Sequence, residues 1–425
     1  MYDINRKHYI IKLSNGKIIN IFYKDNAGIL LSVLNKRNQW TEPLVLLKNC
    51  HPDFSACVDD NDNIHVLCQD NNGNIMYIYS NNNDWNIETI LKSKNPSPYN
   101  KYLNLVYFQE VLIFLFVIEY GGRKILSYQI KEKDKLTAPK VIDYVPFVNK
   151  PFHVVLSPNN SLHVVYKFTE SKSNHIGFRT FIKEEDRWGE FIPITNYKGD
   201  SDLLSASSDI SGSIHLLWQK DALQKYELMY SKYQPLSENR YMEIPLFTAE
   251  YSFELSSIIL LEEQVIVFWV RDNNIYYCIS EDGGNTWGKA STYQLQGGRV
   301  VYCMVYRSTF ENELFTSYIN ELPGNYSGGY KLAFAGDYIF KQKIVGAEDF
   351  RYKLTGTLEL LAKNMEDTRK SLENLQTKVL NLESRKNKIE QEIEKINIKY
   401  DMLNSDLTKI RNIVELITKS KSITE

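Results

Sequence analysis

Three histidines, His65, His163 and His215, occupy the second position of three similar apolar strands. Imidazole nitrogens are common zinc ligands, so three of them together would suggest a metal centre. If the strands are repeats of one unit, however, their equivalent positions lie in separate sheets and cannot share an ion. The sequence therefore predicts no metal site, and it contains no motif for a cofactor.

The octapeptide SEDGGNTW at residues 280–287 has the residue types of a tight turn. The Asp282 carboxylate can accept hydrogen bonds from backbone N–H groups of the turn that it opens. Glycines at positions 283 and 284 permit backbone angles closed to other residues, and Trp287 can pack between two sheets. The segment matches the Asp-box, and over residues 1–345 the chain resembles the sialidase-like BNR-repeat β-propellers. The resemblance implies a structural turn, opposite the ligand-binding face, for Ser280, Asp282, Gly284, Thr286 and Trp287.

The same resemblance implies what a catalytic site would need. It requires three arginines that bind a carboxylate, an Arg-Ile-Pro motif near the first blade, an acid/base carboxyl group and a Tyr–Glu pair. The first repeat contains only Arg6 and Arg37 and no such motif, and the tripeptide at residues 191–193, Phe-Ile-Pro, lacks the arginine. We therefore assign no catalytic residue. A divergent glycoside hydrolase, which would draw one residue from each of several blades, stays open as an alternative.

These candidate residues are positioned by a repeat. One apolar strand recurs seven times at intervals of 46 to 52 residues, with a shorter strand before it and two further strands after it. Four strands in about 50 residues are typical of propeller blades, which bury both apolar faces by packing around an axis. The sequence thus predicts an all-β, seven-bladed β-propeller over residues 1–345. The recurring strands are expected to begin at Ile18, Ile64, Leu112, Leu162, Ile214, Val265 and Leu314.

After an expected linker at residues 346–353, a heptad repeat covers residues 354–425. No proline or glycine follows Leu358, and nine heptads keep one register, which predicts a long α-helical coiled coil of about 95 Å. Attractive pairs such as Lys378 with Glu383 favour a parallel homo-oligomer, and isoleucines at several d positions favour a trimer over a dimer. The polar residue Lys386 is expected to fix the register. The predicted oligomerisation residues are Leu358, Leu361, Leu372, Leu375, Val379, Leu382, Lys386, Ile389, Ile393 and Ile396.

Propellers bind ligands at the mouth of the central channel, through the loops before the first strand and between the second and third strands of each blade. Planar polar groups beside aromatic rings in these loops would suit sugar hydroxyls and ring faces. The predicted ligand-binding residues are Tyr120, Arg123, Arg271, Asp272, Asn325 and Tyr326. The ligand is a glycan or a protein surface, and the alternative is that these loops are simply solvated.

The composition excludes several partners. A formal net charge of −2 gives no basic field for nucleic acid or an anionic membrane. The most hydrophobic segment, residues 111–118, is too short to span a bilayer. The first residues lack a signal-peptide pattern. Five cysteines without a CxxC pair are expected to be buried thiols. The expected location is cytoplasmic, or surface-associated without a signal peptide.

These observations predict a non-catalytic multivalent recognition protein, with a propeller that binds a glycan or protein and a coiled coil that joins several copies. One alternative is the divergent hydrolase. Another is an intracellular scaffold whose coiled coil recruits a different chain.

Overall fold

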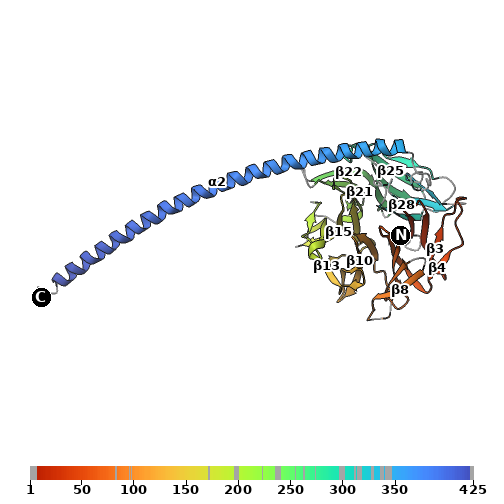
Figure 1. Ribbon diagram of the computed structural model, residues 1–425, viewed down its shortest axis with the longest axis horizontal. Coiled ribbons are helices and arrows are strands. Elements are labelled where there is room, and N and C mark those ends of the chain that lie inside the picture. Colours follow the sequence, from red (N-terminus) through yellow and green to blue (C-terminus); the bar gives the residue numbers. More distant parts are fainter. Residues whose placement is uncertain are drawn as a thin grey trace. The chain divides into compact units, whose positions relative to one another are not determined.

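The computed structural model describes residues 7–81, 84–94, 96, 98–170, 173–195, 201–222, 224–234, 241–253, 255–261, 264–272, 274–295, 302–310, 313, 318–326, 330–335, 339 and 347–421. The chain forms two compact units, Met1–Val345 and Gly346–Glu425. The first unit, called the head below, is a β-propeller-like ring of sheets (Figure 1). The second unit is a single long helix, α2 (Ala347–Lys421).

The described strands of the head form six hydrogen-bonded sheets, in which strands are paired antiparallel except where β1 and β27 join the first and last repeats. The largest sheet combines the first and last repeats: β1 (Lys7–Lys12), β2 (Ile18–Lys24), β3 (Gly28–Val33), β4 (Leu44–Leu47), β27 (Tyr302–Ser308), β28 (Tyr318–Tyr326) and β29 (Tyr330–Leu332). The second repeat contains β5 (Cys50–Val58), β6 (Ile64–Asp70), β7 (Ile75–Asn81) and β8 (Asp84–Leu91). The third contains β9 (Asn104–Phe108), β10 (Val111–Tyr120), β11 (Arg123–Glu132), β12 (Lys135–Leu136) and β13 (Lys140–Val145).

The remaining three sheets follow the same order. The fourth repeat contains β14 (Phe152–Ser157), β15 (Ser161–Glu170), β16 (Ser173–Ile182), the short 3-10 helix η2 (Lys183–Glu185), β17 (Arg187–Trp188) and β18 (Ile192–Pro193). The fifth contains β19 (Ser201–Ser208), β20 (Ile214–Asp221), β21 (Tyr226–Tyr233) and β22 (Tyr241–Ala249). The sixth contains β23 (Ser256–Leu261), β24 (Gln264–Arg271), β25 (Asn274–Ser280) and β26 (Ser291–Tyr293).

The sequence predicts seven blades, and the described strands form six sheets because the first and last repeats pair. Strand β1 pairs with β27 in parallel, in a continuous register from Lys7 opposite Cys303 to Lys12 opposite Ser308. Because this pairing satisfies backbone groups of both strands, the two repeats share one sheet, and the described strands form six sheets. The recurring apolar strands begin within one residue of the predicted position in the first six repeats. The predicted start at Leu314 lies outside the described residues.

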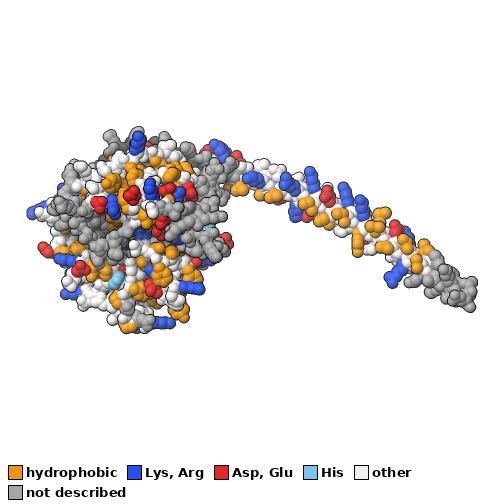
Figure 2. All heavy atoms as spheres, turned by 180° about the vertical axis from the view of Figure 1, so that it is seen from behind, with side chains coloured by type: hydrophobic (Ala, Val, Ile, Leu, Met, Phe, Trp, Pro, Cys, Tyr) orange, Lys and Arg blue, Asp and Glu red, His pale blue; other side chains and the backbone are white. Residues whose placement is uncertain are grey.

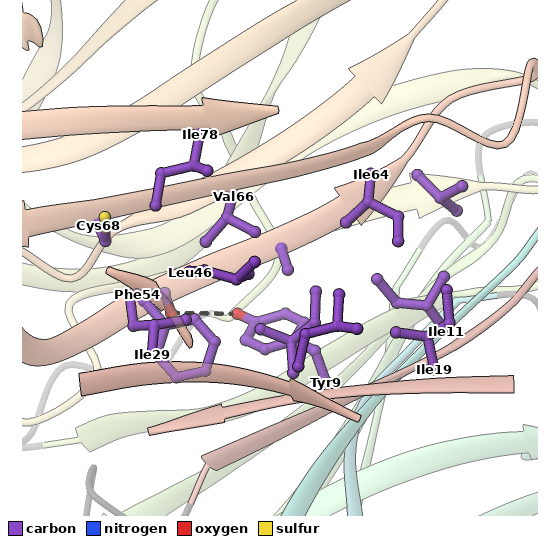
Figure 3. Close-up of a cluster of buried hydrophobic side chains, with 14 of the residues drawn as sticks. Tyr9, Ile11, Ile19, Ile29, Leu46, Phe54, Ile64, Val66, Cys68 and Ile78 are labelled. Carbon is purple, nitrogen blue, oxygen red and sulfur yellow. Dashed lines mark hydrogen bonds between the residues drawn. The ribbon is translucent and has the colours of Figure 1, made fainter. Parts of the chain in front are cut away.

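Buried apolar clusters lie between successive repeats and close the ring. Five clusters join the first repeat to the second, the second to the third, and so on to the sixth. A further cluster joins the sixth, seventh and first repeats. Figure 3 shows the cluster between the first two repeats, where Tyr9 of β1 donates a hydrogen bond to the backbone oxygen of Phe54 in β5 (3.4 Å). Each sheet therefore buries apolar side chains on both faces, as predicted for packed blades.

All five cysteines are buried thiols, as the sequence predicts. Their positions in or beside apolar strands explain this burial, because cysteine packs as a small apolar side chain. Among the described residues, no helix has the length and apolarity needed to cross a membrane.

Helix α2 begins at Ala347, so residues 347–353, expected as a linker, are helical. Acidic residues at positions 348 and 349 suit the first turn of a helix, where the helix dipole favours negative charge. Figure 2 shows hydrophobic side chains along one side of α2 and lysines and arginines along another. The described members of the predicted apolar stripe are 51 to 63 % exposed: Leu372, Leu375, Val379, Leu382, Ile389, Ile393 and Ile396. The side chains of Leu358 and Leu361 lie outside the described residues.

Candidate functional site

The SEDGGNTW segment forms the turn between β25 and β26, the third and fourth strands of the sixth repeat. The Asp282 carboxylate accepts hydrogen bonds from the backbone N–H of Asn285 (3.0 Å) and from the N–H and hydroxyl of Thr286 (2.8 and 2.7 Å). It also accepts one from the Ser280 hydroxyl (2.7 Å). Hydrogen bonds from Thr286 and Ser280 stabilise the anion, so the pKa of Asp282 is held well below its ordinary value. The carboxylate is thus used to hold its own turn.

This turn also packs against the neighbouring repeat. The ring of Trp287 meets the buried ring of Tyr230 in β21 edge to face, with centroids 4.8 Å apart. Gly284 has a φ of +94°, and a Cβ atom there would lie 1.9 Å from the Tyr230 hydroxyl oxygen. Lys232 of β21 donates to the backbone oxygen of Gly283 (2.9 Å). The residues of the octapeptide therefore join two sheets.

The three histidines of the repeat bond within their own sheets. His215 lies with Nε2 3.1 Å from Asp209 Oδ2 and Nδ1 2.7 Å from the Tyr230 hydroxyl. His65 makes the equivalent contacts, 3.3 Å to Asp59 and 2.8 Å to Tyr77. Burial lowers the pKa of His215, so the neutral ring donates from Nε2 to the carboxylate and accepts from the tyrosine.

The third histidine, His163, contacts the hydroxyl of Thr180 (2.9 Å) on the adjacent strand β16. In the described part of the chain, no three His, Cys, Asp or Glu side chains are grouped as metal ligands. The Asp–His–Tyr arrangement of the second and fifth repeats is therefore a recurring structural network, and each copy is confined to one blade.

A pocket lies where the innermost strands of several repeats begin. We call it the central pocket; its volume is about 100 Å³. Strands β1, β5, β9, β14, β27 and β28 and the loops that precede β9 and β14 form its walls. The lining side chains are Lys7, Tyr9, Asp53, Asn100, Tyr102, Leu103, Asn104, Asn149, Lys150, Pro151, Phe152, His153, Val154, Val305, Arg307, Asn320 and Glu321. The loops before β9 and β14 precede first strands, one of the two kinds of loop in which the sequence analysis expects a ligand site.

Two buried polar atoms of the central pocket have no hydrogen-bond partner among the described residues. They are Oδ1 of Asn104 and Nε2 of His153. His153 is 7 % exposed, and burial followed by the nearby Lys150 charge lowers its pKa to about 3, so the ring is neutral at physiological pH. Buried polar atoms normally have partners, and both of these atoms have an unused acceptor lone pair.

Asp53 is the carboxyl group of the central pocket whose pKa is shifted most clearly from its ordinary value. It is 3 % exposed and accepts hydrogen bonds from the backbone N–H groups of Lys101 (2.8 Å) and Leu103 (3.2 Å). Burial raises its pKa to about 6, against the opposing effects of Lys7 and of these backbone bonds. Asp53 therefore titrates close to neutral pH inside the pocket.

Polar contacts cross the ring axis and brace the far wall of the central pocket. Lys150, before β14, forms an ion pair with Glu321 of β28 (2.7 Å). Asn320 of β28 donates to the backbone oxygen of Val154 (2.9 Å) and accepts from Arg307 (3.1 Å). These bonds tie the fourth repeat to the seventh, so the shape of the pocket depends on closure of the ring.

No protein-family model and no curated protein matches this chain. Solved structures with a similar arrangement include a polysaccharide lyase of a new family, the PL25 ulvan lyase bound to -[GlcA(1-4)Rha3S]-. It is 13 % identical over 75 % of this chain and 89 % of that chain, with a TM-score of 0.49. The Aleuria aurantia lectin, described as a six-bladed β-propeller, is 13 % identical over 76 % of this chain and 88 % of its own, with a TM-score of 0.38. Similarity at this level assigns no activity.

The six predicted ligand-binding residues lie at three separate places. Tyr120 and Arg123 face each other across the β10–β11 hairpin tip, and Tyr120 is 76 % exposed. Arg271 and Asp272, after β24, contact each other (3.4 Å), and the Arg271 guanidinium lies 4.6 Å from the ring centroid of Tyr251. The other two residues belong to β28, where Asn325 is 1 % exposed and the Tyr326 side chain lies outside the described residues. None of the five whose side chains the structure describes lines the central pocket.

The sequence interpretation missed the residues that do line it. Asp53, Asn104 and His153 belong to first strands, whereas the prediction concentrated on loops after second strands. The available signal was a polar residue inside a short apolar strand, as in FHVVLS around His153 and NLVYF at Asn104.

Proposed function

We propose that this chain is a non-catalytic, multivalent glycan-recognition protein. Its head is a seven-bladed propeller whose first and last blades share a sheet, and the central pocket binds the sugar. Helix α2 joins copies in a parallel coiled coil, a trimer or a dimer. The observation that carries this proposal is the exposed heptad stripe of α2.

A stripe of this kind needs a partner. Apolar residues at a and d positions remain more than half exposed from Leu372 to Leu407, while charged residues occupy the other faces. Water strongly disfavours so long an apolar surface, and a second helix with the same heptads would cover it. Lys386 at an a position contacts Glu390 of its own helix (3.6 Å), which provides an acidic partner for a charge placed in the seam.

The central pocket supports a neutral, hydroxyl-rich ligand inside the head. Oδ1 of Asn104 and Nε2 of His153 are acceptors for hydroxyl groups, and the half-buried Tyr102 supplies aromatic surface. Tyr120, Arg123, Arg271, Asp272, Asn325 and Tyr326 remain proposed contacts for the rim. The octapeptide turn has a structural role in this proposal, because its polar atoms bond one another and Trp287 packs on Tyr230.

Self-association is tested by sedimentation velocity on the full chain and on a variant with Leu375→Asp and Leu382→Asp. We expect the native chain to sediment as a trimer or dimer and the variant as a monomer. Asn381→Asp, a c position on the opposite face, is the matched control and should leave the assembly intact. A monomeric native chain would contradict the proposal, and capture of a different chain through α2 would instead support the scaffold alternative.

Ligand binding is tested on a glycan array with the same proteins, followed by titration calorimetry on the best sugar. We expect monomerisation to weaken array binding by at least tenfold, because linked sites raise avidity. Asn104→Leu should weaken binding about tenfold by removing one acceptor from the pocket. Asn61→Leu, in the exposed turn after β5 and far from the pocket end of that strand, is the control. Equal binding by both variants would refute the pocket assignment.

A second candidate function, glycoside hydrolysis, rests on Asp53 alone. An acid with a pKa near 6 inside a pocket can act as a general acid, with Glu321 as the other carboxyl group of the pocket. Turnover of chromogenic glycosides that disappears in Asp53→Asn would favour this candidate. We rank it second because Asp53 accepts two backbone hydrogen bonds, which gives it a structural task as well.

A further inference from the structure

An unusually exposed group of aromatic side chains lies on the third repeat. Tyr120, Tyr144 and Phe147 are 76, 52 and 62 % exposed, and they come from the β10–β11 hairpin tip, from β13 and from the loop before β14. At the tip, Gly121 and Gly122 have φ values of +58° and +71°, and neither has an atom within 4 Å of its Cβ direction. This tight two-residue turn therefore projects Tyr120 and Arg123 into open space.

Two cations are held against these rings. The Arg123 guanidinium lies 5.4 Å from the Tyr144 ring centroid. The Lys124 ammonium lies 4.8 Å from the ring centroid of Tyr102 and 4.9 Å from that of Phe147. These two cations and three exposed rings, Tyr120, Arg123, Lys124, Tyr144 and Phe147, are called the aromatic patch below. Cations over ring faces hold the rings in place and add positive charge to the surface.

Lys124 is an unusual member of the patch because it is 8 % exposed. Its ammonium donates to the Tyr102 hydroxyl (3.2 Å), and no carboxylate of the described residues lies within ion-pair distance of it. Glu119, the residue opposite Lys124 in the hairpin, is exposed and makes no such pair. A buried charge is costly without a counter-charge, so this position favours an anion supplied by a ligand.

The aromatic patch is continuous with the central pocket. Tyr102 lines the pocket, and its hydroxyl accepts a hydrogen bond from Lys124 and donates one to the backbone oxygen of Val148 (3.0 Å). The loop that carries Phe147 continues directly into Asn149 and Lys150 of the pocket wall. A ligand that leaves the pocket over Tyr102 therefore reaches Phe147 and Lys124 first.

We propose that the aromatic patch is an outer subsite for an acidic sugar unit of a linear oligosaccharide whose next units occupy the central pocket. The inference rests on the proposed glycan-binding function and names its ligand class, a glycan with carboxylate or sulfate groups. Pyranose rings stack on the exposed faces of Tyr120 and Phe147, and Lys124 and Arg123 bind the anionic group. A neutral chain would leave Lys124 without a counter-charge and bind more weakly.

The test uses the full-length protein and titration calorimetry with four probes. They are a hyaluronan octasaccharide, its methyl ester, a heparin-derived octasaccharide and chitohexaose. The hyaluronan pair shares one sugar backbone and differs in whether its carboxyl groups are charged or methyl-esterified. The heparin probe distinguishes sulfate from carboxylate recognition. We expect at least one acidic probe to bind at least tenfold more tightly than the neutral probes.

Three variants locate the binding. Lys124→Met keeps the apolar stem and removes the charge, whereas Phe147→Ala and Tyr120→Ala remove exposed rings that do not support the core. Each should weaken the acidic probe at least tenfold, and Lys124→Met should weaken the acidic probes by a larger factor than the neutral probes. Leu44→Ala, at a half-exposed apolar residue on β4 of another repeat, is the control and should have no effect.

The outcomes separate this inference from the proposed function. The inference is overturned if the native protein and the patch variants bind the acidic probes with equal affinity. The inference is also overturned if the native protein binds the neutral probes more tightly than the acidic ones. In that case the pocket assignment stands if Asn104→Leu loses this binding and Phe147→Ala does not. If no probe and no array glycan binds the native protein, both proposals fall.

Discussion

Replacement of Gly284 by alanine measures how tightly the octapeptide turn fits its neighbour. Two terms are expected. A non-glycine residue at a φ of +94° costs about 1–2 kcal/mol in backbone strain. The new Cβ would also lie 1.9 Å from the hydroxyl oxygen and 2.7 Å from the nearest ring carbon of Tyr230. Relief of that clash by moving a buried ring costs about 1–3 kcal/mol more.

Tyr230 cannot relax without further loss. It is fully buried, its hydroxyl lies 2.7 Å from His215 Nδ1, and its ring contacts Trp287. We therefore expect Gly284→Ala to lower the free energy of unfolding of the head by about 3 kcal/mol. The measurement is equilibrium urea unfolding of the full chain, followed by tryptophan fluorescence.

Gly122→Ala is the matched control. Its φ of +71° is also positive, but no atom lies within 4 Å of the added Cβ, so only the strain term of about 1–2 kcal/mol applies. The change in unfolded-chain entropy is common to both substitutions and cancels in their difference. If Gly284→Ala costs no more than Gly122→Ala, the packing of the turn against Tyr230 contributes nothing, and the structural role proposed for the octapeptide is wrong.

Three further predictions concern buried polar groups and the helix. Burial raises the pKa of Asp53 from 3.8 to about 6, so the folded head binds a proton more tightly than the unfolded chain. The free energy of unfolding should therefore fall by up to about 3 kcal/mol as pH rises from about 4 to 6. Urea unfolding midpoints measured across this pH range should show the fall in the native chain and not in Asp53→Asn. Tyr230→Phe removes the hydroxyl partner of the buried His215 nitrogen and should lower the free energy of unfolding by about 1–3 kcal/mol. Tyr226 is a partly exposed residue of the same strand, and Tyr226→Phe should change the free energy of unfolding little. Lys386→Leu should raise the melting temperature of the helix by circular dichroism and broaden the distribution of oligomers in sedimentation, and an unchanged melting temperature would show that position 386 does not enter a helix–helix seam.

The fold followed from local patterns, which is why much of it could be predicted. A strand such as IHVLCQD, which became β6 from Ile64, is apolar on both faces because both faces pack on other blades. The heptads after Leu354 likewise depend only on neighbours three and four residues away, and they predict the helix. The shared sheet of β1 and β27 could not be predicted, because no local pattern records which edges meet at the axis.

The candidate site depends on contacts of the opposite kind. Lys150 and Glu321 are 171 residues apart in the chain, and Tyr102 matters for the site only because Lys124 and Val148 converge on it. Such groups come together when the ring closes, so residue spacing gives no hint of them. Arg271 was predicted from its loop type alone, and it lies against Tyr251 instead of the pocket.

The parallel pair of β1 and β27 can form only late in synthesis of the chain. Strand β1 leaves the ribosome early, but its partner follows only after roughly 290 further residues, which takes about 15–60 s at ordinary translation speeds. Until then this edge of β1 is unpaired, and it can pair incorrectly with strands of other nascent chains. Because α2 is translated after β27, the head has both strands of this pair before synthesis of the helix that we propose joins the copies, so in that proposal the ring can close before copies associate.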